Sequence, residues 1–402
     1  MNIIELFDQL GVDNAPGQES LKKEAATAML GPMLGGIPVD FSHGDVNAHT
    51  PAPNSFEAFR DGVVEGAAQA YTPYRGRGEL LRSVAQKLSD FTGTQINGDE
   101  ELILTPGTQG ALFLAMGANM MPGDKVAIIE PDYFANRKMV TFFHGEIVPI
   151  QLKYEGRESG AGLDLQELEN AFQAGVKLFL FSNPNNPVGC IYTQEEVTGI
   201  AKLARQYHVT VIADELYSRQ IYDNTPYTHL CACPDAPDDI ITIIGPSKTE
   251  SLSGYRLGVA FGAKAIIDRM EKLQAIMSLR CGGYNQRVFT CWFNEPADWL
   301  KNRIAEHRRI RDDILAVIGK TPGVSARRTE GGSYLFVRIP ELKVTLHEFI
   351  NHLRAQAHVT VTPGTEFGPQ FVNHFRINFS QDHDAAVDAM KRLFSTMEWY
   401  RK

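Results

Sequence analysis

The sequence of 402 residues predicts an α/β protein, with a large domain built around a mostly parallel sheet and a smaller α+β domain after it. Four short apolar runs are continuous rather than alternating, as expected for strands that are covered on both faces. Stretches with apolar residues at helical spacing separate these runs, and strands that alternate with helices are typical of parallel sheets. From about residue 280 the pattern changes to a long charged helix, a short strand, and then helix, strand and helix.

Apolar residues at positions i, i+3 and i+4 predict most of the helices. The predicted helices span 55–70, 78–92, 108–121, 164–174, 194–207, 264–278, 297–318, 345–357 and 383–400. The predicted strands of the large sheet are 125–130, 178–182, 209–214 and 240–244, and residues 331–337 predict a strand of the smaller domain.

Three parts of the chain are predicted. Residues 1–50 are too short to fold alone and are expected to pack on the C-terminal domain. Residues 51–285 are expected to form the large domain, and residues 286–402 the small one. No sequence repeat and no low-complexity tract interrupts the chain, which argues against a solenoid or an array of modules.

Composition argues against several classes of protein. Hydrophobic residues make up 43% and charged residues 22% of the chain, which is typical of a folded globular protein. The net charge of −9 argues against nucleic acid or a membrane surface as the partner. The five cysteines form no CxxC pair and the histidines show no HxxxH or HExxH spacing, so we expect neither a disulfide framework nor a metal site. No apolar run approaches the ~18 residues of a membrane-spanning helix, and the N-terminus carries acids where a secretory signal carries bases, so we expect a cytoplasmic protein.

Chemically active side chains follow the four predicted strands of the large sheet. In open α/β sheets, ligands bind outside the carboxyl ends of the strands. The segments at these ends are EPDY at 130–133, NPNNPVG at 183–189, DELY at 214–217 and GPSKT at 245–249. We therefore expect an aromatic ring, amides, a carboxylate, a phenol and a lysine along one edge of the sheet.

These side chains suit a planar, electrophilic and anionic cofactor. An amine such as that of Lys248 forms a Schiff base with a carbonyl group when desolvation or nearby positive charge lowers its pKa. A carboxylate such as Asp214 holds a pyridine nitrogen protonated, while an aromatic side chain stacks on the ring. A phosphate group needs backbone N–H groups at a helix start and an arginine, for which residues 107–109 and Arg256 are candidates.

Each of these residues also has an ordinary structural explanation. The NPNNPVG segment alone is compatible with a simple turn cluster, and an isolated lysine is most often a solvated charge. Asp214 is also a candidate helix N-cap, and Arg376 a candidate partner for a surface acid. Tyr71 and Tyr133 are equally candidates for the hydrophobic core.

Six motifs, in order along the chain, resemble those of the class I/II aminotransferases, which are fold type I pyridoxal-phosphate-dependent enzymes. They are YTPYRG at 71–76 with LR at 81–82, TPGTQ at 105–109, NPNNPVG at 183–189, ADELY at 213–217, SKTESLSGYRLG at 247–258 and FRIN at 375–378. The resemblance covers about residues 30–390. It implies a large domain with a mostly parallel seven-stranded sheet and a smaller α+β domain.

The resemblance implies a role for each matching residue. Lys248 is implied to form the Schiff base and to carry a proton between the substrate Cα and the cofactor, and Asp214 to pair with the pyridinium nitrogen. Tyr217 and Asn186 are implied to bond the phenolic oxygen of the cofactor, and Tyr133 to stack on its ring. The remaining implied contacts are those of Gly107, Thr108, Gln109, Ser247 and Arg256 with the phosphate, of Tyr71 with the phosphate of a neighbouring subunit, and of Arg376, Asn186 and the Gly44 backbone with the substrate.

At five positions we compare this sequence with residues that are frequent in the family. Gly245 stands where many members have a serine or threonine that touches the phosphate. Gln109 stands where some bacterial aspartate-type members have a lysine that binds a distal carboxylate. Asp132 and Asn136 replace frequent aromatic residues and predict a more polar pocket over the cofactor. Arg280 lies near the segment that in some relatives brings a side-chain-reading arginine across a dimer interface, with a surface ion pair as the alternative.

The predicted function is a pyridoxal 5′-phosphate-dependent aminotransferase that moves the amino group of an L-amino acid to a 2-oxo acid by a ping-pong mechanism, as a homodimer. The alternative is a pyridoxal-phosphate-dependent lyase or an enzyme like aminocyclopropane-carboxylate synthase, which would use the same residues. A regulatory protein is disfavoured because a DNA-binding module does not fit before residue 30 and Lys248 is present, and a dehydrogenase because no GxGxxG follows a strand. The sequence leaves the donor open among dicarboxylate, aromatic, basic and polar amino acids.

Overall fold

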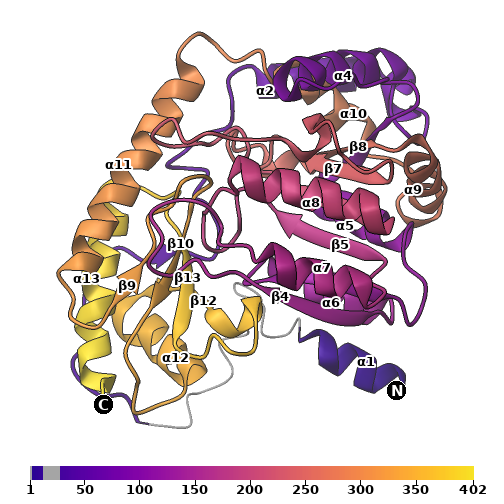
Figure 1. Ribbon diagram of the computed structural model, residues 1–402. Helices are drawn as coiled ribbons and strands as arrows, with labels where there is room; N and C mark the ends of the chain where they lie inside the picture. The colour runs from indigo at the N-terminus through magenta and orange to yellow at the C-terminus, as the bar shows by residue number, and fades with distance from the viewer. Residues whose placement is uncertain (1, 12–27) are drawn as a thin grey trace.

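A computed structural model describes residues 2–11 and 28–402, and its largest element is a seven-stranded sheet (Figure 1). The strands from β7 to β4 run parallel, and β8 runs antiparallel to both of its neighbours. The predicted α/β fold with a mostly parallel sheet is therefore confirmed. Across the sheet the strands are β2 (Leu102–Pro106), β8 (Leu257–Gly262), β7 (Ile240–Ile244), β6 (Thr210–Asp214), β5 (Leu178–Ser182), β3 (Lys125–Glu130) and β4 (Glu146–Gln151).

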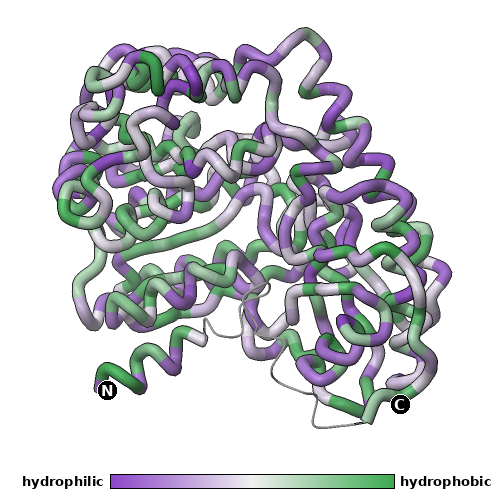
Figure 2. Tube along the Cα trace, turned by 180° about the vertical axis from the view of Figure 1, so that it is seen from behind, coloured by the Kyte–Doolittle hydropathy of each residue, from purple (hydrophilic) through white to green (hydrophobic). Residues whose placement is uncertain are grey.

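Helices cover both faces of this sheet, because successive side chains of each strand point to opposite faces. Phe179 packs with α7 (Leu165–Gln173) and α8 (Gln194–Tyr207), whereas its neighbour Leu180 packs in the cluster on the other face. In Figure 2 the tube through the interior is mostly green, while the outer helices alternate between green and purple. The helices of the second face are α5 (Gly107–Gly117), α6 (Phe134–Phe142) and α9 (Lys264–Met277).

A smaller antiparallel sheet of four strands has its own core. Its strands lie in the order β12 (Thr362–Pro363), β13 (His374–Asn378), β10 (Tyr334–Arg338) and β9 (Ser325–Ala326). The helices that share this core are α11 (Trp299–Gly319), α12 (Leu346–Ala357) and α13 (His383–Tyr400).

The described N-terminal residues pack on a helix of the large domain and on the core of the small sheet. Helix α1 (Ile3–Leu10) contacts α6, as Figure 1 shows at the lower edge of the large sheet. Strand β1 (Val39–Asp40) pairs in parallel with β11 (Val359–Thr360), and Phe41 is buried in the core of the small sheet. The division into residues 1–50, 51–285 and 286–402 stays a prediction.

The helix predicted over 55–70 is wrong as a single element. The chain forms α2 (Ser55–Val64) and α3 (Ala67–Ala70), with a break at Gly66. Gly66 has a φ of 62°, a left-handed conformation that ends the regular hydrogen-bond pattern and that glycine adopts at little cost. Helix α5 also ends at Gly117, earlier than the predicted 121.

Several elements that sequence patterns did not reveal complete the large sheet. Strand β8 contains Gly258 and Gly262, and β4 contains Pro149, which are residues that weaken a strand pattern. Sequence patterns also did not reveal α10 (Gly283–Gln286) and the short 3₁₀ turns Leu230–Ala232, Ser253–Tyr255, Arg287–Thr290 and Gly364–Phe367.

Helix α4 (Gly78–Thr92) matches the helix predicted over 78–92.

Local sequence signals account for the helix starts near the site. Thr193 caps α8 by accepting the N–H of Glu196, and the Glu196 carboxylate in turn accepts the N–H of Thr193. This reciprocal pair satisfies two N–H groups that a helix start leaves without partners. Thr345 and Glu348 form the same capping box at the start of α12.

In residues 2–11 and 28–402, no helix is long and apolar enough to cross a membrane. Within the same ranges, no group of three or more His, Cys, Asp or Glu side chains is arranged to hold a metal ion.

Candidate active site

The carboxyl ends of four neighbouring parallel strands bring together the residues that the sequence singled out. Tyr133 follows β3, Asn186 follows β5, Asp214 ends β6 and Lys248 follows β7. They surround a cavity of about 330 Å³. The predicted residues that line it are Thr108, Gln109, Tyr133, Asn186, Asp214, Tyr217, Ser247, Lys248 and Arg256.

One end of this cavity is the start of α5, where two glycines permit a close approach. Gly107 has a φ of 77°, and a Cβ on it would lie 2.5 Å from Nη2 of Arg256. A Cβ on Gly258 would lie 2.3 Å from the carbonyl carbon of Gly107. Glycine at both positions therefore lets the Arg256 guanidinium and β8 approach the first N–H groups of α5. An arginine beside a helix N-terminus is a favourable place for a phosphate.

Gly245, the departure from the family pattern on this side, is explained by crowding. A Cβ on Gly245 would lie 3.0 Å from Cγ2 of Thr108 and 3.1 Å from the carbonyl oxygen of Leu257. A serine or threonine there requires these neighbours to move. Ser247, two residues later, donates its hydroxyl proton to the same Leu257 carbonyl at 3.1 Å.

Asp214 is a buried carboxyl group that lines the cavity. Burial raises its pKa to about 6, because water no longer stabilises the charged form. Its side chain accepts one backbone hydrogen bond, from Leu216 at 3.1 Å. In the described part of the chain, no cationic side chain pairs with it. A cation placed in the cavity, such as a protonated ring nitrogen, would stabilise this carboxylate.

The Tyr133 ring forms one wall of the cavity. Its hydroxyl donates to Oε1 of Gln109 at 2.9 Å, and burial raises the pKa of this phenol above its ordinary value. The preceding residue, Asp132, accepts the N–H of Tyr133 at 2.6 Å and the N–H of Ser182 at 3.0 Å. The Ser182 hydroxyl also donates to Asp132 and accepts the N–H of Asn186 at 3.2 Å. Asp132 thus holds the ends of β3 and β5 together, and burial raises its pKa to about 7.

Arg376, on β13 of the small sheet, contacts two residues of the cavity wall, Asn186 and Tyr334. Its Nη1 donates to Oδ1 of Asn186 at 3.0 Å, and its Nη2 donates to the Ser42 carbonyl at 2.9 Å and to Oγ1 of Thr362 at 3.3 Å. The Nε atom is buried and has no hydrogen-bond partner among the described residues. The guanidinium also lies over the ring of Tyr334, with Cζ 4.3 Å from the ring centroid. The group is therefore held in place by neutral partners and keeps its charge for a ligand.

Three cations at this site have no carboxylate partner. Within residues 2–11 and 28–402, no carboxylate oxygen lies within 4.0 Å of Lys248, Arg256 or Arg376, although ion pairs are common elsewhere in the chain. Arg376 is buried and Lys248 is half-buried, and such cations are normally paired, whereas Arg256 is exposed. The arrangement thus fits a ligand that brings a phosphate to Arg256 and a carboxylate to Arg376.

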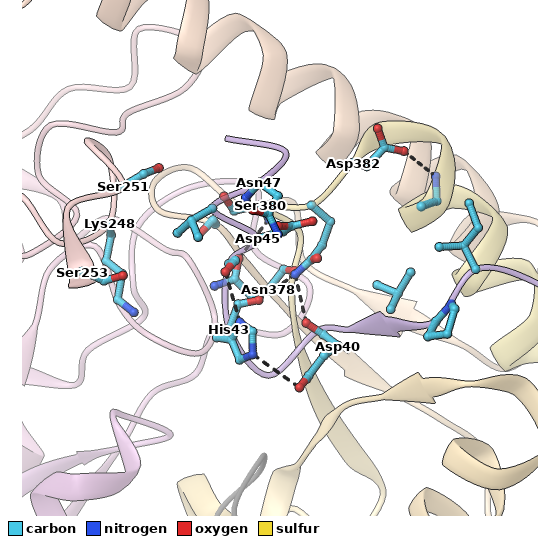
Figure 3. A pocket seen from close by; sticks show the side chains of 18 of the residues that line it. Asp40, His43, Asp45, Asn47, Lys248, Ser251, Ser253, Asn378, Ser380 and Asp382 are labelled. Atoms are coloured by element: carbon cyan, nitrogen blue, oxygen red, sulfur yellow. Dashed lines mark hydrogen bonds and ion pairs between the residues drawn. The ribbon is translucent and has the colours of Figure 1, made fainter. Parts of the chain in front are cut away.

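A second cavity of about 530 Å³ meets the first at Lys248. Figure 3 shows Lys248 on one side of it and the pair of His43 and Asp40 on the other. The distance from Nε2 of His43 to the Asp40 carboxylate is 3.4 Å, and this partner raises the pKa of His43. Burial opposes ionisation of Asp40, but hydrogen bonds from His43 and Ser42 outweigh it and lower its pKa to about 2. Gly44, predicted at the substrate, lines this second cavity.

Tyr71 lines neither of the two cavities. Its side chain is 80% exposed on the outer surface near α3. Arg280 lies beside it, with Cζ 5.8 Å from the ring centroids of both Tyr71 and Tyr74. Within this one chain, Tyr71 and Arg280 do not reach Lys248.

The structure also adds residues that the sequence reasoning missed. Tyr334 lines the first cavity, but it stands at the beginning of β10, so the rule about strand carboxyl ends did not indicate it. The Gly331-Gly332-Ser333 run before it was the available signal, since such a run marks a close approach of backbone to another group. Ser182, Ser253, Leu112, Phe134 and Leu216 line the cavity as well.

Comparisons with known proteins agree with these observations. Residues 37–393 match the family described as aminotransferase class I and II. The chain is 27% identical over 350 residues to an aspartate aminotransferase of Sulfolobus acidocaldarius, covering 84% of this chain and 86% of that protein. It is 26% identical over 383 residues to an aspartate aminotransferase of Musicola paradisiaca, covering 95% and 93%.

A solved structure extends the agreement to the whole fold. The crystal structure of an aspartate aminotransferase from Rhodobacter sphaeroides 2.4.1 is 53% identical, covers 100% of both chains and superimposes with a TM-score of 0.95. The resemblance inferred from the six motifs is confirmed. Because the family match spans most of the sequence and the cavity carries the matching residues, this chain belongs to the class I and II aminotransferases, a family of pyridoxal-phosphate-dependent enzymes that transfer amino groups.

Proposed function

We propose that this aminotransferase binds pyridoxal 5′-phosphate in the cavity at Lys248 and moves the amino group of an acidic L-amino acid to a 2-oxo acid. One observation carries the proposal: Lys248, Arg256 and the buried Asp214 line one cavity, and Arg376 binds Asn186 in its wall, while none of the three cations has a carboxylate partner among the described residues. A phosphate, a ring nitrogen and a substrate carboxylate together supply the partners that these groups lack. When bound, the cofactor supplies a ring that withdraws electrons from the substrate Cα.

The residues that would hold the cofactor lie on separate structural elements. We assign the covalent attachment to Lys248 and the contact with the ring nitrogen to Asp214, whose carboxylate a bound cation stabilises. Tyr133 would stack on the ring, and Tyr217 and Asn186 would contact its phenolic oxygen. The phosphate would lie between Gly107, Thr108, Gln109, Ser247 and Arg256, at the start of α5.

The chain's own groups then have distinct tasks in the reaction. Arg376 would bind the substrate carboxylate with its planar guanidinium, which Asn186 and the Ser42 carbonyl hold in place. Nζ of Lys248, released when the substrate amine takes its place, would remove the proton from Cα and return it to the cofactor side. The buried Tyr217 and the half-buried Tyr133 would keep water away from this proton.

The relatives support a dicarboxylate as the substrate. The Rhodobacter sphaeroides structure at 53% identity and the two curated relatives carry the name aspartate aminotransferase. Gln109 is committed to Tyr133 through a hydrogen bond, so it does not replace the lysine that reads the distal carboxylate in some relatives. We assign that contact to Arg280 of a neighbouring subunit, which has an exposed surface around it.

A homodimer would complete the site. Tyr71 and Arg280 lie on one surface, and exposed apolar side chains surround them. Large exposed apolar patches mark interaction surfaces. A second copy that covers this surface would bring Tyr71 toward the phosphate of its neighbour. The exposed apolar residues are Val63, Val64, Tyr74, Ile276, Met277 and Leu279.

We also propose that the enzyme works in the cytoplasm. All five cysteines are free thiols, and four of them are buried. Free thiols persist in compartments that are kept reducing.

The visible absorbance spectrum of the purified enzyme tests the proposal. We expect the band of the lysine-bound cofactor to disappear when aspartate or glutamate is added without a keto acid, and to return when 2-oxoglutarate or oxaloacetate follows. Leucine, phenylalanine and arginine serve as controls that lack a distal carboxylate. Accumulation of ammonia together with a keto acid would favour the lyase alternative, and no cofactor band after reconstitution would contradict the proposal altogether.

A further inference from the structure

A buried guanidinium joins two turns that carry residues of the site. Arg219 lies two residues after Tyr217, in the turn that follows β6, and Glu250 lies two residues after Lys248, in the turn that follows β7. Nη1 of Arg219 donates to the Glu250 carboxylate. Both side chains are buried, at 7% and 1% exposure. The two turns are therefore bonded to each other through side chains to which the proposed reaction gives no task.

A second carboxylate holds the same guanidinium in place. Nη1 and Nη2 of Arg219 donate to the two carboxylate oxygens of Glu295 at 2.9 and 3.1 Å. Cζ of Arg219 also lies 4.0 Å from the centroid of the Phe293 ring. Two parallel hydrogen bonds and a ring face fix the plane of a guanidinium. Glu250 is thus bonded to a group whose position is already set.

Hydrogen bonds of the backbone close each of the two turns. The N–H of Ser251 donates to the Lys248 carbonyl at 3.0 Å, and the N–H of Gln220 donates to the Tyr217 carbonyl at 2.9 Å. A closed turn moves as one unit, so a constraint on the Glu250 side chain is passed to the backbone of Lys248. A buried ion pair often adds little net stability, and in some proteins its role is to select one conformation.

We propose that Arg219 and Glu250 form a positioning pair that fixes the backbone of Lys248 relative to Tyr217. Neither residue lines the first cavity, so both act through the turns that they join. The pair would keep Nζ of Lys248 within reach of the carbonyl carbon of the cofactor while Tyr217 contacts the phenolic oxygen. This inference rests on the proposed function, because it requires that the cofactor attaches to Lys248.

Glu250→Ala removes the bond between the turns without leaving a buried charge alone. Arg219 keeps both bonds to Glu295, so the Tyr217 turn keeps its anchor. Glu250→Gln keeps an oxygen that accepts from Nη1. Burial raises the pKa of Glu250 to about 7, although the charge of Arg219 opposes this rise, so a neutral amide is a close substitute. Glu250→Asp, which is one methylene shorter, is the second variant that weakens the bond, and it decides the question if Glu250→Ala does not fold.

Two forms of the cofactor separate the position of Lys248 from damage to the rest of the site. The aldehyde of pyridoxal phosphate joins the Lys248 amine with loss of one water, whereas pyridoxamine phosphate carries an amine and forms no such bond. Both forms present the same phosphate, ring nitrogen and phenolic oxygen. The cofactor-free proteins are titrated with each form. We expect Glu250→Ala to raise the Kd for pyridoxal phosphate about 10-fold and that for pyridoxamine phosphate less than about twofold. Glu250→Gln should stay within about threefold of the wild type for both forms.

Glu366→Ala provides the control for loss of a carboxylate from an ion pair. The Glu366 carboxylate bonds Lys138 of α6 at 2.8 Å, and its side chain is 10% exposed. This variant should be less stable in urea, while the ratio of its two Kd values should equal that of the wild type. Hydrogen exchange of the cofactor-free proteins gives a second measurement. Exchange over residues 246–252 should be faster in Glu250→Ala than in the wild type and in Glu366→Ala.

Three results would overturn the inference: a rise by the same factor for both forms of the cofactor, an unchanged Kd for pyridoxal phosphate in Glu250→Ala or Glu250→Asp, and unchanged exchange over residues 246–252. A Glu250→Gln variant as weak as Glu250→Ala would also contradict it, since the amide keeps the bond to Arg219. A wild type that binds pyridoxal phosphate no better than pyridoxamine phosphate, or binds neither, contradicts the proposed function instead. In that case the exchange measurement still decides whether Glu250 holds the Lys248 turn.

Discussion

Gly107→Ala tests whether the cavity end at α5 depends on the position of the Arg256 guanidinium. Gly107 has a φ of 77°, a left-handed conformation that costs residues with a side chain about 1 kcal/mol. The added Cβ would lie 2.5 Å from Nη2 of Arg256, whereas nonbonded heavy atoms normally keep about 3.5 Å. The guanidinium must therefore move by about 1 Å, which removes one charge-assisted hydrogen bond to a phosphate. Such a bond contributes about 1.5–3 kcal/mol, so pyridoxal phosphate should bind about 10- to 150-fold more weakly.

Gly93→Ala provides the matched control for this variant. Gly93 also has a φ of 77°, at the end of α4, but a Cβ there would meet nothing within 4 Å. In urea unfolding without cofactor, each variant should lose about 1 kcal/mol of stability from the left-handed conformation. In a titration of the cofactor-free protein with pyridoxal phosphate, only Gly107→Ala should show a raised Kd. A Kd for Gly107→Ala equal to those of Gly93→Ala and the wild type would refute the reasoning.

Three further predictions concern single side chains of the site. Lys248→Ala should abolish both turnover and the visible band of the bound cofactor, and a variant with full activity would contradict the role assigned to Lys248. Arg376→Lys should raise KM for every amino acid by about 10- to 100-fold, because one ammonium replaces a planar group that bonds three neutral partners at once, and kcat measured at saturation should fall less. Burial raises the pKa of Asp132 to about 7 from about 4 in an unfolded chain, so the folded protein keeps this proton longer and its free energy of unfolding falls as pH rises from about 4 to about 7. Asp132→Asn has no such proton, and urea unfolding at several pH values should show that this part of the decline has disappeared; an unchanged slope would mean that other groups cause it.

Two of the departures from the family pattern are accommodated by nearby groups. Glycine suits position 245 because a Cβ would lie 3.0 Å from Thr108 and 3.1 Å from the Leu257 carbonyl, and Ser247 supplies a hydroxyl two residues later. Asp132 is not an isolated polar residue, since backbone N–H groups at the ends of β3 and β5 donate to it. By contrast, both polar atoms of the Asn136 side chain are buried without a hydrogen-bond partner among the described residues. The sequence indicated the polarity of this region, whereas the partners became clear only from the strand positions.

The sequence by itself determined four strands of the large sheet and the residues at their carboxyl ends. Strands β3, β5, β6 and β7 match the apolar runs because a strand buried on both faces requires a continuous apolar sequence. Parallel strands end at the same edge, so Tyr133, Asn186, Asp214 and Lys248 follow from that pattern. Breaks at glycine, such as Gly66, were less predictable, because tertiary contacts decide whether a glycine interrupts a helix.

Only the tertiary structure decided which distant residues meet at that edge. Arg376 and Asn186 are 190 residues apart in sequence, and they touch because β13 and β10 pack beside the large sheet. Tyr334 joins Tyr217 for the same reason, although the rule about strand carboxyl ends does not cover the beginning of a strand. The physical reason is that periodicity records which face of an element is buried, whereas the packing of two sheets decides which buried faces share a cavity.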